Sequence, residues 1–390
     1  MAKVKLGIIG MGNMGTTHIK SVIDGLVPEI ELAAVADSSP ARREWAAGFL
    51  PAGFPIYNDG SELIRSGKIE AILIAVPHYQ HPPLAIEGFK AGLHVMCEKP
   101  AGVYTKQVRE MNKIARESGK VFAMMFNQRT NSWYRKMHDL VQGGTLGSIR
   151  RVTWIITNWY RPQFYYDSGD WRATWAGEGG GVLLNQCPHN LDLLQWITGM
   201  PNSVRASCHN GKWHNIEVED DVTAYLEYPN GATGVFITTT GEAPGTNRLE
   251  VSLDKGKIIN EDGNTLVLHE LDVDEREFTR NARGAFDKPN ITVKKVETDG
   301  SNEQHNGVLK AFAGKILHGT PLVADGAEGI NGLTLSNAMH LSSWLDKTIK
   351  IPFDEDLFLA ELDKRRQASK IKTGPSVVFE TGKSYNSGKI

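Results

Sequence analysis

The chain has 390 residues, of which 41% are hydrophobic and 23% are charged, and its formal net charge is −2. This length is sufficient for two domains with full cores, and a charge balance near zero gives no electrostatic reason to expect nucleic acid or a membrane as a partner. Three cysteines without a Cys-x-x-Cys pair suggest neither a disulfide framework nor a zinc ribbon. Because the chain also lacks a signal-peptide pattern and a membrane-spanning apolar run, we expect a cytoplasmic protein. We expect no bound metal.

The N-terminal region contains a glycine motif between a predicted strand, 4–9, and a predicted helix, 16–26. The motif reads Gly10-Met11-Gly12-Asn13-Met14-Gly15. In this context the first glycine allows a tight turn, the second lets the backbone approach a pyrophosphate, and the third permits close packing of helix on strand. The phosphates would then lie at the positive N-terminus of the helix. The motif therefore predicts a dinucleotide-binding domain.

A second predicted strand, 30–36, ends in Asp37 and Ser38, about 20 residues beyond the glycine motif. An acidic side chain at this position hydrogen-bonds the adenosine ribose and repels a 2′-phosphate. Its alternative role is that of a helix cap in an ordinary turn. We expect NAD as the cofactor rather than NADP, with Arg42 and Arg43 close enough to weaken the distinction.

Strands and helices continue to alternate as far as about residue 128, with strands predicted at 71–76, 93–96 and 120–126. This alternation predicts an α/β fold with a doubly wound parallel sheet in a domain spanning 1–128. Such sheets bind ligands beyond the carboxyl ends of their strands. The further cofactor-binding residues expected there are Ala75, Val76, Pro77, His81, Glu98, Lys99 and Asn127.

A second glycine-rich stretch, Glu178-Gly179-Gly180-Gly181, leads into an apolar segment that carries Asn185, His189 and Asp192. If Asn185 caps a helix, the spacing of these three polar residues places them on one face. The simpler interpretation is a glycine loop followed by an amphipathic core helix that happens to contain a histidine.

Taken together, these motifs resemble the Gfo/Idh/MocA oxidoreductases, and the resemblance extends over nearly the whole chain. The residues that carry it are the N-terminal glycines, the segment Ala91-Gly92-x-His94-Val95-x-x-Glu98-Lys99-Pro100, and Gly179 to Asp192. The resemblance implies that Lys99 and His189 flank the nicotinamide ring and the reacting carbon. Many members carry aspartate at position 185, whereas this chain has Asn185, so His189 lacks one partner for its protonated form.

The region from Trp154 to Trp175 is rich in aromatic residues interleaved with charges. Sugar sites combine aromatic platforms with polar groups, so we expect Tyr165, Tyr166, Trp171 and Arg172 to bind substrate together with Lys99, Asn185 and His189. The alternative is that these aromatic residues pack a sheet or a subunit interface.

Short strands punctuated by turns follow, including a hairpin at Pro229-Asn230-Gly231. They predict an α+β domain spanning 129–368 with a large, mostly antiparallel open sheet. The resemblance implies that this sheet forms a homodimer or homotetramer. Residues 369–390 are expected to form a tail or arm.

The function predicted is an NAD-dependent dehydrogenase that oxidises a secondary hydroxyl of a sugar, glycoside or inositol. In this hypothesis His189 accepts the hydroxyl proton and Lys99 polarises the oxygen. One alternative is a redox-neutral glycoside hydrolase or lyase that retains NAD, with His78, His81, Tyr165 and Tyr166 as acid–base candidates. Another is a cofactor-sensing regulator, against which intact Lys99 and His189 argue.

Overall fold

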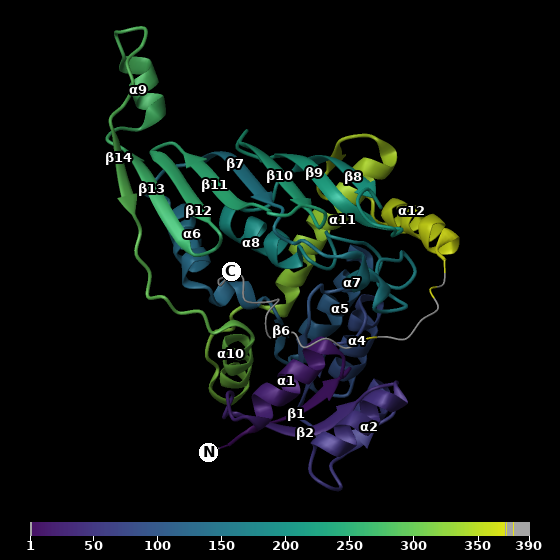
Figure 1. Ribbon diagram of the computed structural model, residues 1–390. Coiled ribbons are helices and arrows are strands. Elements are labelled where there is room, and N and C mark those ends of the chain that lie inside the picture. Colours follow the sequence, from purple (N-terminus) through teal and green to yellow (C-terminus); the bar gives the residue numbers. More distant parts are fainter. Residues whose placement is uncertain (1, 371, 373–376, 378–390) are drawn as a thin grey trace.

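The computed structural model describes residues 2–370, 372 and 377. It consists of a parallel sheet at the N-terminal end of the chain and a larger sheet that packs above it (Figure 1). Most of the predicted tail, 369–390, lies outside the described residues.

The N-terminal sheet has six parallel strands in the order β3-β2-β1-β4-β5-β6, which confirms the predicted doubly wound α/β fold. Near-continuous apolar runs form these strands because helices bury both faces of the sheet. The strands are β1 (Val4–Ile9), β2 (Ile30–Ala36), β3 (Ile56–Tyr57), β4 (Ala71–Ile74), β5 (His94–Cys97) and β6 (Phe122–Met124).

Helices from both ends of the chain cover this sheet. One face packs on α3 (Gly60–Ile64), α4 (His81–Lys90) and α5 (Thr105–Ser118). The opposite face packs on α1 (Asn13–Ile23), α2 (Pro40–Phe49) and, from far along the chain, α10 (Gln304–His318). Four buried residues of α10 join the same apolar cluster as β1: Val308, Leu309, Phe312 and Ala313. A segment of the predicted second domain therefore completes the core of the first.

The second sheet has nine strands in the order β14-β13-β12-β11-β7-β10-β9-β8-β15, and it is antiparallel except where β7 pairs with β10. This confirms the predicted mostly antiparallel sheet. Its strands are β7 (Ile149–Ile156), β8 (Ser203–Asn210), β9 (Glu219–Glu227), β10 (Thr233–Thr239), β11 (Asn247–Leu253), β12 (Gly256–Glu261), β13 (Thr265–Leu271), β14 (Ile291–Lys295) and β15 (Ile349–Lys350). The predicted Asn-Gly hairpin joins β9 to β10, with Gly231 at a φ of +84°.

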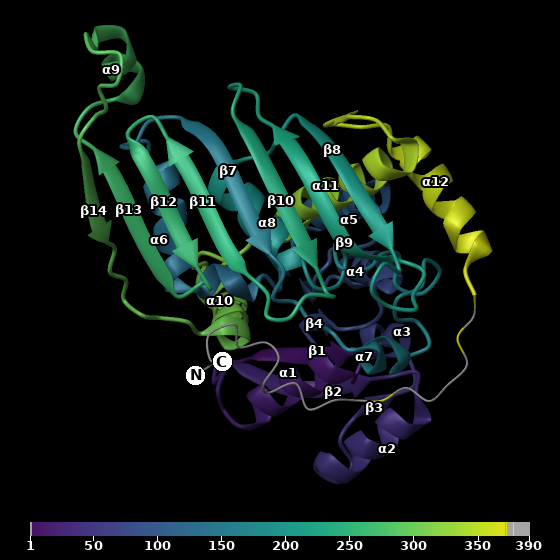
Figure 2. The same cartoon turned by 45° about the horizontal axis from the view of Figure 1, so that its top comes forward.

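Helices cover one face of the nine-stranded sheet and leave the other face open (Figure 2). The covering helices are α6 (Ser132–Gln142), α8 (Pro188–Thr198) and α11 (Gly329–Leu345). The remaining helices are α7 (Gln163–Asp167), α9 (Glu275–Asn281), α12 (Glu355–Ala368) and the 3-10 turns η1 (His78–Gln80), η2 (Asn127–Thr130) and η3 (Gly326–Glu328). Strand β14 forms one edge of the sheet, and helix α9 projects away from the sheet beside it (Figure 1).

Candidate active site

The glycine motif has a separate structural requirement at each of its three positions. Gly10 has a φ of +91°, and a Cβ there would lie 2.3 Å from the carbonyl oxygen of Ala75. A Cβ on Gly15 would lie 1.8 Å from the carbonyl oxygen of Gly10, whereas one on Gly12 would meet no atom within 4 Å. Helix α1 begins directly after Gly12 and has no side-chain cap. Open space at Gly12 and a helix N-terminus without a side-chain cap fit a dinucleotide pyrophosphate.

The carboxylate of Asp37 lies at the end of β2 against this motif. Its Oδ2 accepts the N–H of Met11 at 2.6 Å, and its Oδ1 accepts the N–H of Ser39 at 2.8 Å. The Arg42 guanidinium donates to the carbonyl oxygen of Met11 at 2.6 Å and to Thr16 Oγ1 at 2.7 Å. Burial lowers the pKa of Arg42, and the charge of Asp37 acts against that shift.

The second nearby cation, Arg43, donates through Nη1 to the main-chain oxygens of Asp37 and Ser38, at 2.7 and 2.8 Å. Both guanidinium groups therefore already bind the chain around Asp37. Asp37 places an acidic side chain at the strand end, and an acidic group there favours a ribose with free hydroxyls over one that carries a phosphate.

A buried histidine joins the ends of β4 and β5. The two ring nitrogens of His81 lie 2.7 Å from the carbonyl oxygens of Val76 and Pro100. Burial lowers the pKa of His81, and both carbonyl contacts oppose that shift. Since Ala75 and Val76 adjoin Gly10, His81 connects the expected cofactor site to the turn that carries Lys99.

Behind Lys99, the expected cofactor-binding residue Glu98 meets two histidines, His18 and His305, that were not predicted from the sequence. Glu98 Oε1 lies 2.7 Å from His18 Nε2, and the His18 ring meets the His305 ring edge-on at 5.6 Å. Burial would raise the pKa of Glu98, but the His18 hydrogen bond and the nearby positive charges lower it to about 2. His18 had a local signal, because it lies one helical turn after Gly15. His305 belongs to α10, about 200 positions from Glu98, and its place beside Glu98 had no signal in the sequence.

The last of the expected cofactor-binding residues, Asn127, lies at the start of η2, which follows β6. Its Nδ2 donates to Gln304 Oε1, at the start of α10. Its Oδ1 is buried and has no partner among the described residues, so one polar atom is left to bind a ligand.

Lys99 extends from the end of β5 to the loop of the second glycine stretch, where its Nζ donates to the carbonyl oxygen of Asn185 at 2.8 Å. Burial lowers the pKa of Lys99, and the carboxylates of Glu98 and Glu178 oppose this shift. An ammonium group has three N–H donors, so this contact leaves two of them.

Helix α8 begins at Pro188 and not at Asn185, because residues 181–187 form turns. His189 is only 4% exposed, and neither ring nitrogen has a hydrogen-bond partner among the described residues. Burial, followed by the charges of Lys99 and His305, holds the His189 pKa well below its usual 6.5. A neutral imidazole with two unused ring nitrogens suits proton transfer to or from a ligand.

Asp192, three residues further along, does not serve His189. Arg129 holds both of its carboxylate oxygens, at 2.8 and 2.6 Å, and also binds Glu328 at 2.7 Å. The buried Arg129–Asp192 pair and the part-exposed Glu328 join η2, α8 and η3, so Asp192 has a structural role.

Some of the expected substrate-binding residues in the aromatic segment lie close to Asn185 and Lys99. The Arg172 guanidinium lies 4.6 Å from the centre of the Tyr165 ring and 4.7 Å from that of Trp171, and it donates to the Tyr165 hydroxyl at 2.9 Å. That hydroxyl donates to Asn185 Oδ1 at 3.2 Å. Tyr165, Trp171, Arg172, Asn185 and Lys99 thus form one connected cluster.

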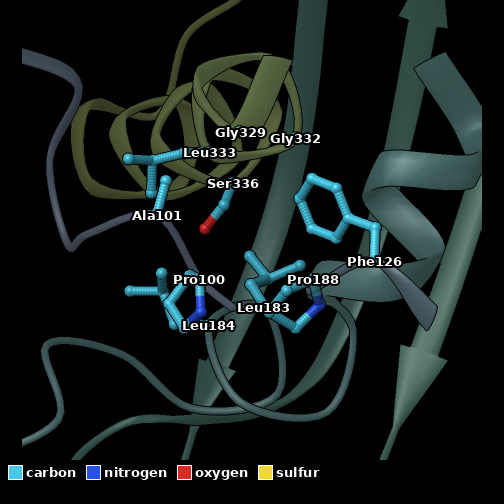
Figure 3. A pocket seen from close by; sticks show the side chains of 10 residues that line it. All are labelled: Pro100, Ala101, Phe126, Leu183, Leu184, Pro188, Gly329, Gly332, Leu333 and Ser336. Carbon is cyan, nitrogen blue, oxygen red and sulfur yellow. The ribbon is translucent and has the colours of Figure 1, made fainter. Parts of the chain in front are cut away.

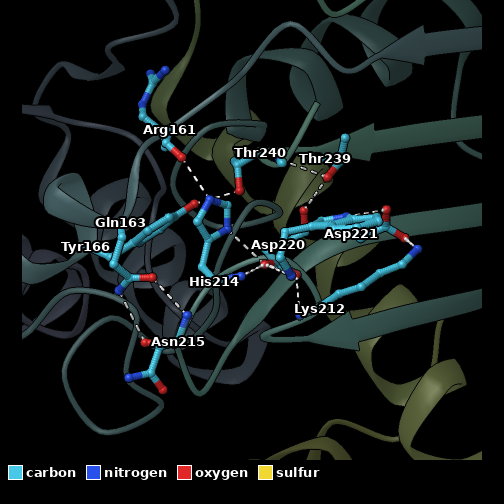
Figure 4. A network of polar contacts seen from close by, with 12 residues as sticks. Arg161, Gln163, Tyr166, Lys212, His214, Asn215, Asp220, Asp221, Thr239 and Thr240 are labelled. Atoms are coloured by element: carbon cyan, nitrogen blue, oxygen red, sulfur yellow. Dashed lines mark hydrogen bonds and ion pairs between the residues drawn. The ribbon is translucent and has the colours of Figure 1, made fainter. Parts of the chain in front are cut away.

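Tyr166 occupies a different environment. Its hydroxyl donates to Thr240 Oγ1 at 2.6 Å, and its ring lies 4.8 Å from that of His214. His214 in turn contacts Asp220 at 2.9 Å and the carbonyl oxygen of Arg161 at 2.8 Å (Figure 4). Successive residues of α7 point in different directions, so Tyr166 supports the sheet while its neighbour Tyr165 faces Asn185.

A small apolar cavity lies beneath the two prolines that follow Lys99 and precede His189 (Figure 3). Its only polar side chain is Ser336. It separates the loops of the site from α11 and lacks the groups a sugar requires. Within residues 2–370, 372 and 377, no cluster of three or more potential metal ligands was found, and no helix is long and apolar enough to cross a membrane.

Comparison with known proteins matches two family models to the chain. One, described as an oxidoreductase family with an NAD-binding Rossmann fold, matches residues 4–126. The other, described as the GFO/IDH/MocA C-terminal domain, matches residues 134–259.

Similar proteins include dehydrogenases from distant organisms. Trans-1,2-dihydrobenzene-1,2-diol dehydrogenase of Bos taurus is 31% identical over 65% of this chain and 72% of its own length. Myo-inositol 2-dehydrogenase of Thermotoga maritima is 24% identical over 89% of this chain and 98% of its own length. The alignments with two other curated relatives span only 61% and 62% of those proteins. A solved structure of the WlbA dehydrogenase from Bordetella pertussis, in complex with NADH and UDP-GlcNAcA, is 26% identical with a TM-score of 0.75, covering 90% of this chain and all of that one.

Proposed function

Because the chain belongs to the Gfo/Idh/MocA family of NAD-binding oxidoreductases, we propose that it oxidises a secondary hydroxyl of a sugar, glycoside or inositol. The observation that carries the proposal is the buried His189 ring, whose two nitrogens have no partner within the described chain and whose pKa is lowered by burial and by the nearby Lys99. Buried polar atoms are normally satisfied, so an unsatisfied pair points to a ligand.

In this mechanism His189 accepts the proton of the substrate hydroxyl, for which its neutral form is required. Lys99 presents its two remaining N–H donors to the same oxygen and stabilises the negative charge that develops there. NAD, when bound, supplies the hydride acceptor. The residues suited to hold it are the loop from Gly10 to Gly15, Asp37 and Ser38, the strand ends at Ala75 to Pro77, Glu98 and Asn127.

A polyhydroxylated ring is the substrate class that the cluster favours. Trp171 offers an apolar face for C–H groups, and Arg172 and Lys99 offer donors for hydroxyl or carboxylate oxygens. An inositol dehydrogenase and a sugar-nucleotide complex among the similar proteins agree with this class.

The test is a screen of sugars, glycosides and inositols with NAD, followed at the absorbance of reduced nicotinamide. We expect oxidation of at least one, with Lys99→Ala and His189→Ala each lowering kcat by about 10²–10⁴ while the Kd for NAD changes little. Wild-type turnover by His189→Ala would refute the assigned base. Release of a glycone without accumulation of NADH would instead establish the redox-neutral alternative.

We propose further that the open face of the nine-stranded sheet joins two copies of the chain. It carries the half-buried apolar residues Ile155, Val235, Ile237 and Ile259, with Tyr225 42% exposed. Light scattering on Ile237→Glu should show smaller assemblies than the wild type, with the parallel domain still able to bind NAD. An unchanged mass would contradict this assignment.

A further inference from the structure

Glu178, the residue before the three glycines, is a buried carboxyl that the proposed mechanism leaves without a role. It is 2% exposed. Its Oε2 accepts the N–H of Ala173 at 2.6 Å, and its Oε1 accepts the side-chain Nδ2 of Asn185. Burial raises the pKa of Glu178, while the charge of Arg172 and these two hydrogen bonds act in the opposite direction.

The carboxylate determines which way the Asn185 amide points. An ionised carboxylate can only accept hydrogen bonds, so the Nδ2 of Asn185 has to face Glu178. Its Oδ1 must then face the other way, where it accepts the Tyr165 hydroxyl at 3.2 Å. The Tyr165 oxygen is left to accept from Arg172. A chain of directed hydrogen bonds therefore runs from Glu178 through Asn185 and Tyr165 to Arg172.

Asn185 also holds the ammonium group of Lys99, through its main-chain oxygen at 2.8 Å. One residue thus contacts the proposed oxygen-polarising group with its backbone and the proposed substrate-binding group with its side chain. Fixing Asn185 fixes the relative position of both.

We infer that Glu178 is a positioning residue of the reaction, which orients Asn185 and thereby sets Lys99 and Tyr165 in register for the substrate hydroxyl. The inference rests on the proposed function. It also accounts for an amide at position 185, because an aspartate there would bring two carboxylates within hydrogen-bonding distance, where both cannot readily ionise.

Exchanging the two groups tests the inference. Glu178→Gln removes the charge that orients the amide, and we expect kcat to fall about tenfold or more. The double variant Glu178→Gln/Asn185→Asp rebuilds the pair in reverse. In it the new amide at position 178 donates to the new carboxylate at position 185, which still accepts from Tyr165. We expect the double variant to recover kcat to within about threefold of the wild type.

Glu219→Gln is the matched control, because Glu219 is a buried carboxyl that holds the same loop through the N–H groups of Gly181 and Leu183. Combining it with Asn185→Asp should give no recovery of kcat. Equal recovery in both double variants would show that the loop, and not the Glu178–Asn185 pair, determines activity.

Asn185→Asp alone provides a second readout should Glu178→Gln fail to fold. With Glu178 intact, the two carboxyls share a proton, so kcat should be lower at pH 8 than at pH 6 relative to the wild type. A wild-type pH profile for this variant, or wild-type kcat for Glu178→Gln, overturns the inference. An inactive wild type would overturn the proposed function instead, so the two failures are distinct.

Discussion

Two alanine substitutions in the glycine motif should have opposite consequences, although they lie three residues apart. In Gly15→Ala the new methyl group would meet the main-chain oxygen of Gly10 at 1.8 Å, so α1 must move away from β1. Overpacking of this kind costs about 1–3 kcal/mol, and backbone cannot yield as a side chain does, so we expect about 3 kcal/mol. In Gly12→Ala the methyl group meets no protein atom within 4 Å, and the φ of −70° suits alanine. Its cost should fall on NAD, whose pyrophosphate needs the same space.

Thermal unfolding and NAD titration by calorimetry separate the two effects. We expect Gly15→Ala to lower Tm by about 4 °C. We expect Gly12→Ala to raise the Kd for NAD about tenfold or more, equivalent to about 1.4 kcal/mol, with Tm nearly unchanged. Gly48→Ala is the control, because this glycine of α2 also has open space around it and no positive φ. This variant should raise the free energy of unfolding by about 0.5–1 kcal/mol and leave the Kd for NAD unchanged. Wild-type NAD affinity in Gly12→Ala would refute the assignment of that space to the cofactor.

The remaining predictions concern the substrate cluster and the ionisable groups near it. Tyr165→Phe should raise KM for the substrate severalfold because Asn185 and Arg172 each lose a partner, whereas Tyr166→Phe should lower Tm and leave KM unchanged; equal KM effects in steady-state kinetics would contradict this. The pKa of Glu98 is lowered from its usual 4.5 to about 2, so its ionised form stabilises the fold above pH 4.5. The free energy of unfolding measured in urea should therefore fall by about 2 kcal/mol between pH 5 and pH 3, and Glu98→Gln should abolish this fall. The lowered pKa of His189 should keep kcat/KM for oxidation constant down to pH 6.5, and a half-maximal rate at pH 6.5 would argue against His189 as the base.

Features that depend on neighbouring residues were predictable from the sequence. Strands β1 and β2 begin and end where the apolar runs do, and the glycine motif follows from strand, turn and helix signals in one short segment. Helix α1 begins at Asn13, three residues earlier than predicted, because the positive-φ turn at Gly10 leaves the next residues free to enter the helix. The hairpin at Asn230-Gly231 was also predictable, because its turn signal lies directly between two strand-forming runs.

The site was less predictable because its contacts join distant segments. The sequence placed Asn185 and His189 on one helix, but the turns at 181–187 separate them and turn Asn185 toward Lys99. Motif spacing cannot indicate that Glu178 bonds the Asn185 amide or that Asp192 is committed to Arg129. The sequence pattern likewise predicts the same substrate-binding role for Tyr165 and Tyr166. Only the folded structure distinguishes them, because Tyr165 bonds Asn185 whereas Tyr166 bonds Thr240.

The position of α10 constrains how the chain is synthesised. The flank of the parallel sheet that receives Phe312 emerges from the ribosome about 300 residues before α10 does, which at about 5–20 residues per second is on the order of 15–60 s. During that interval the apolar side chains of β1 have no cover from α10, and transiently exposed apolar surface of this kind makes a nascent chain prone to aggregation. For the same reason, a gene fragment that ends near residue 128 encodes an incomplete core. A grafted or recombined NAD-binding module from this protein would have to carry residues 304–318 with it.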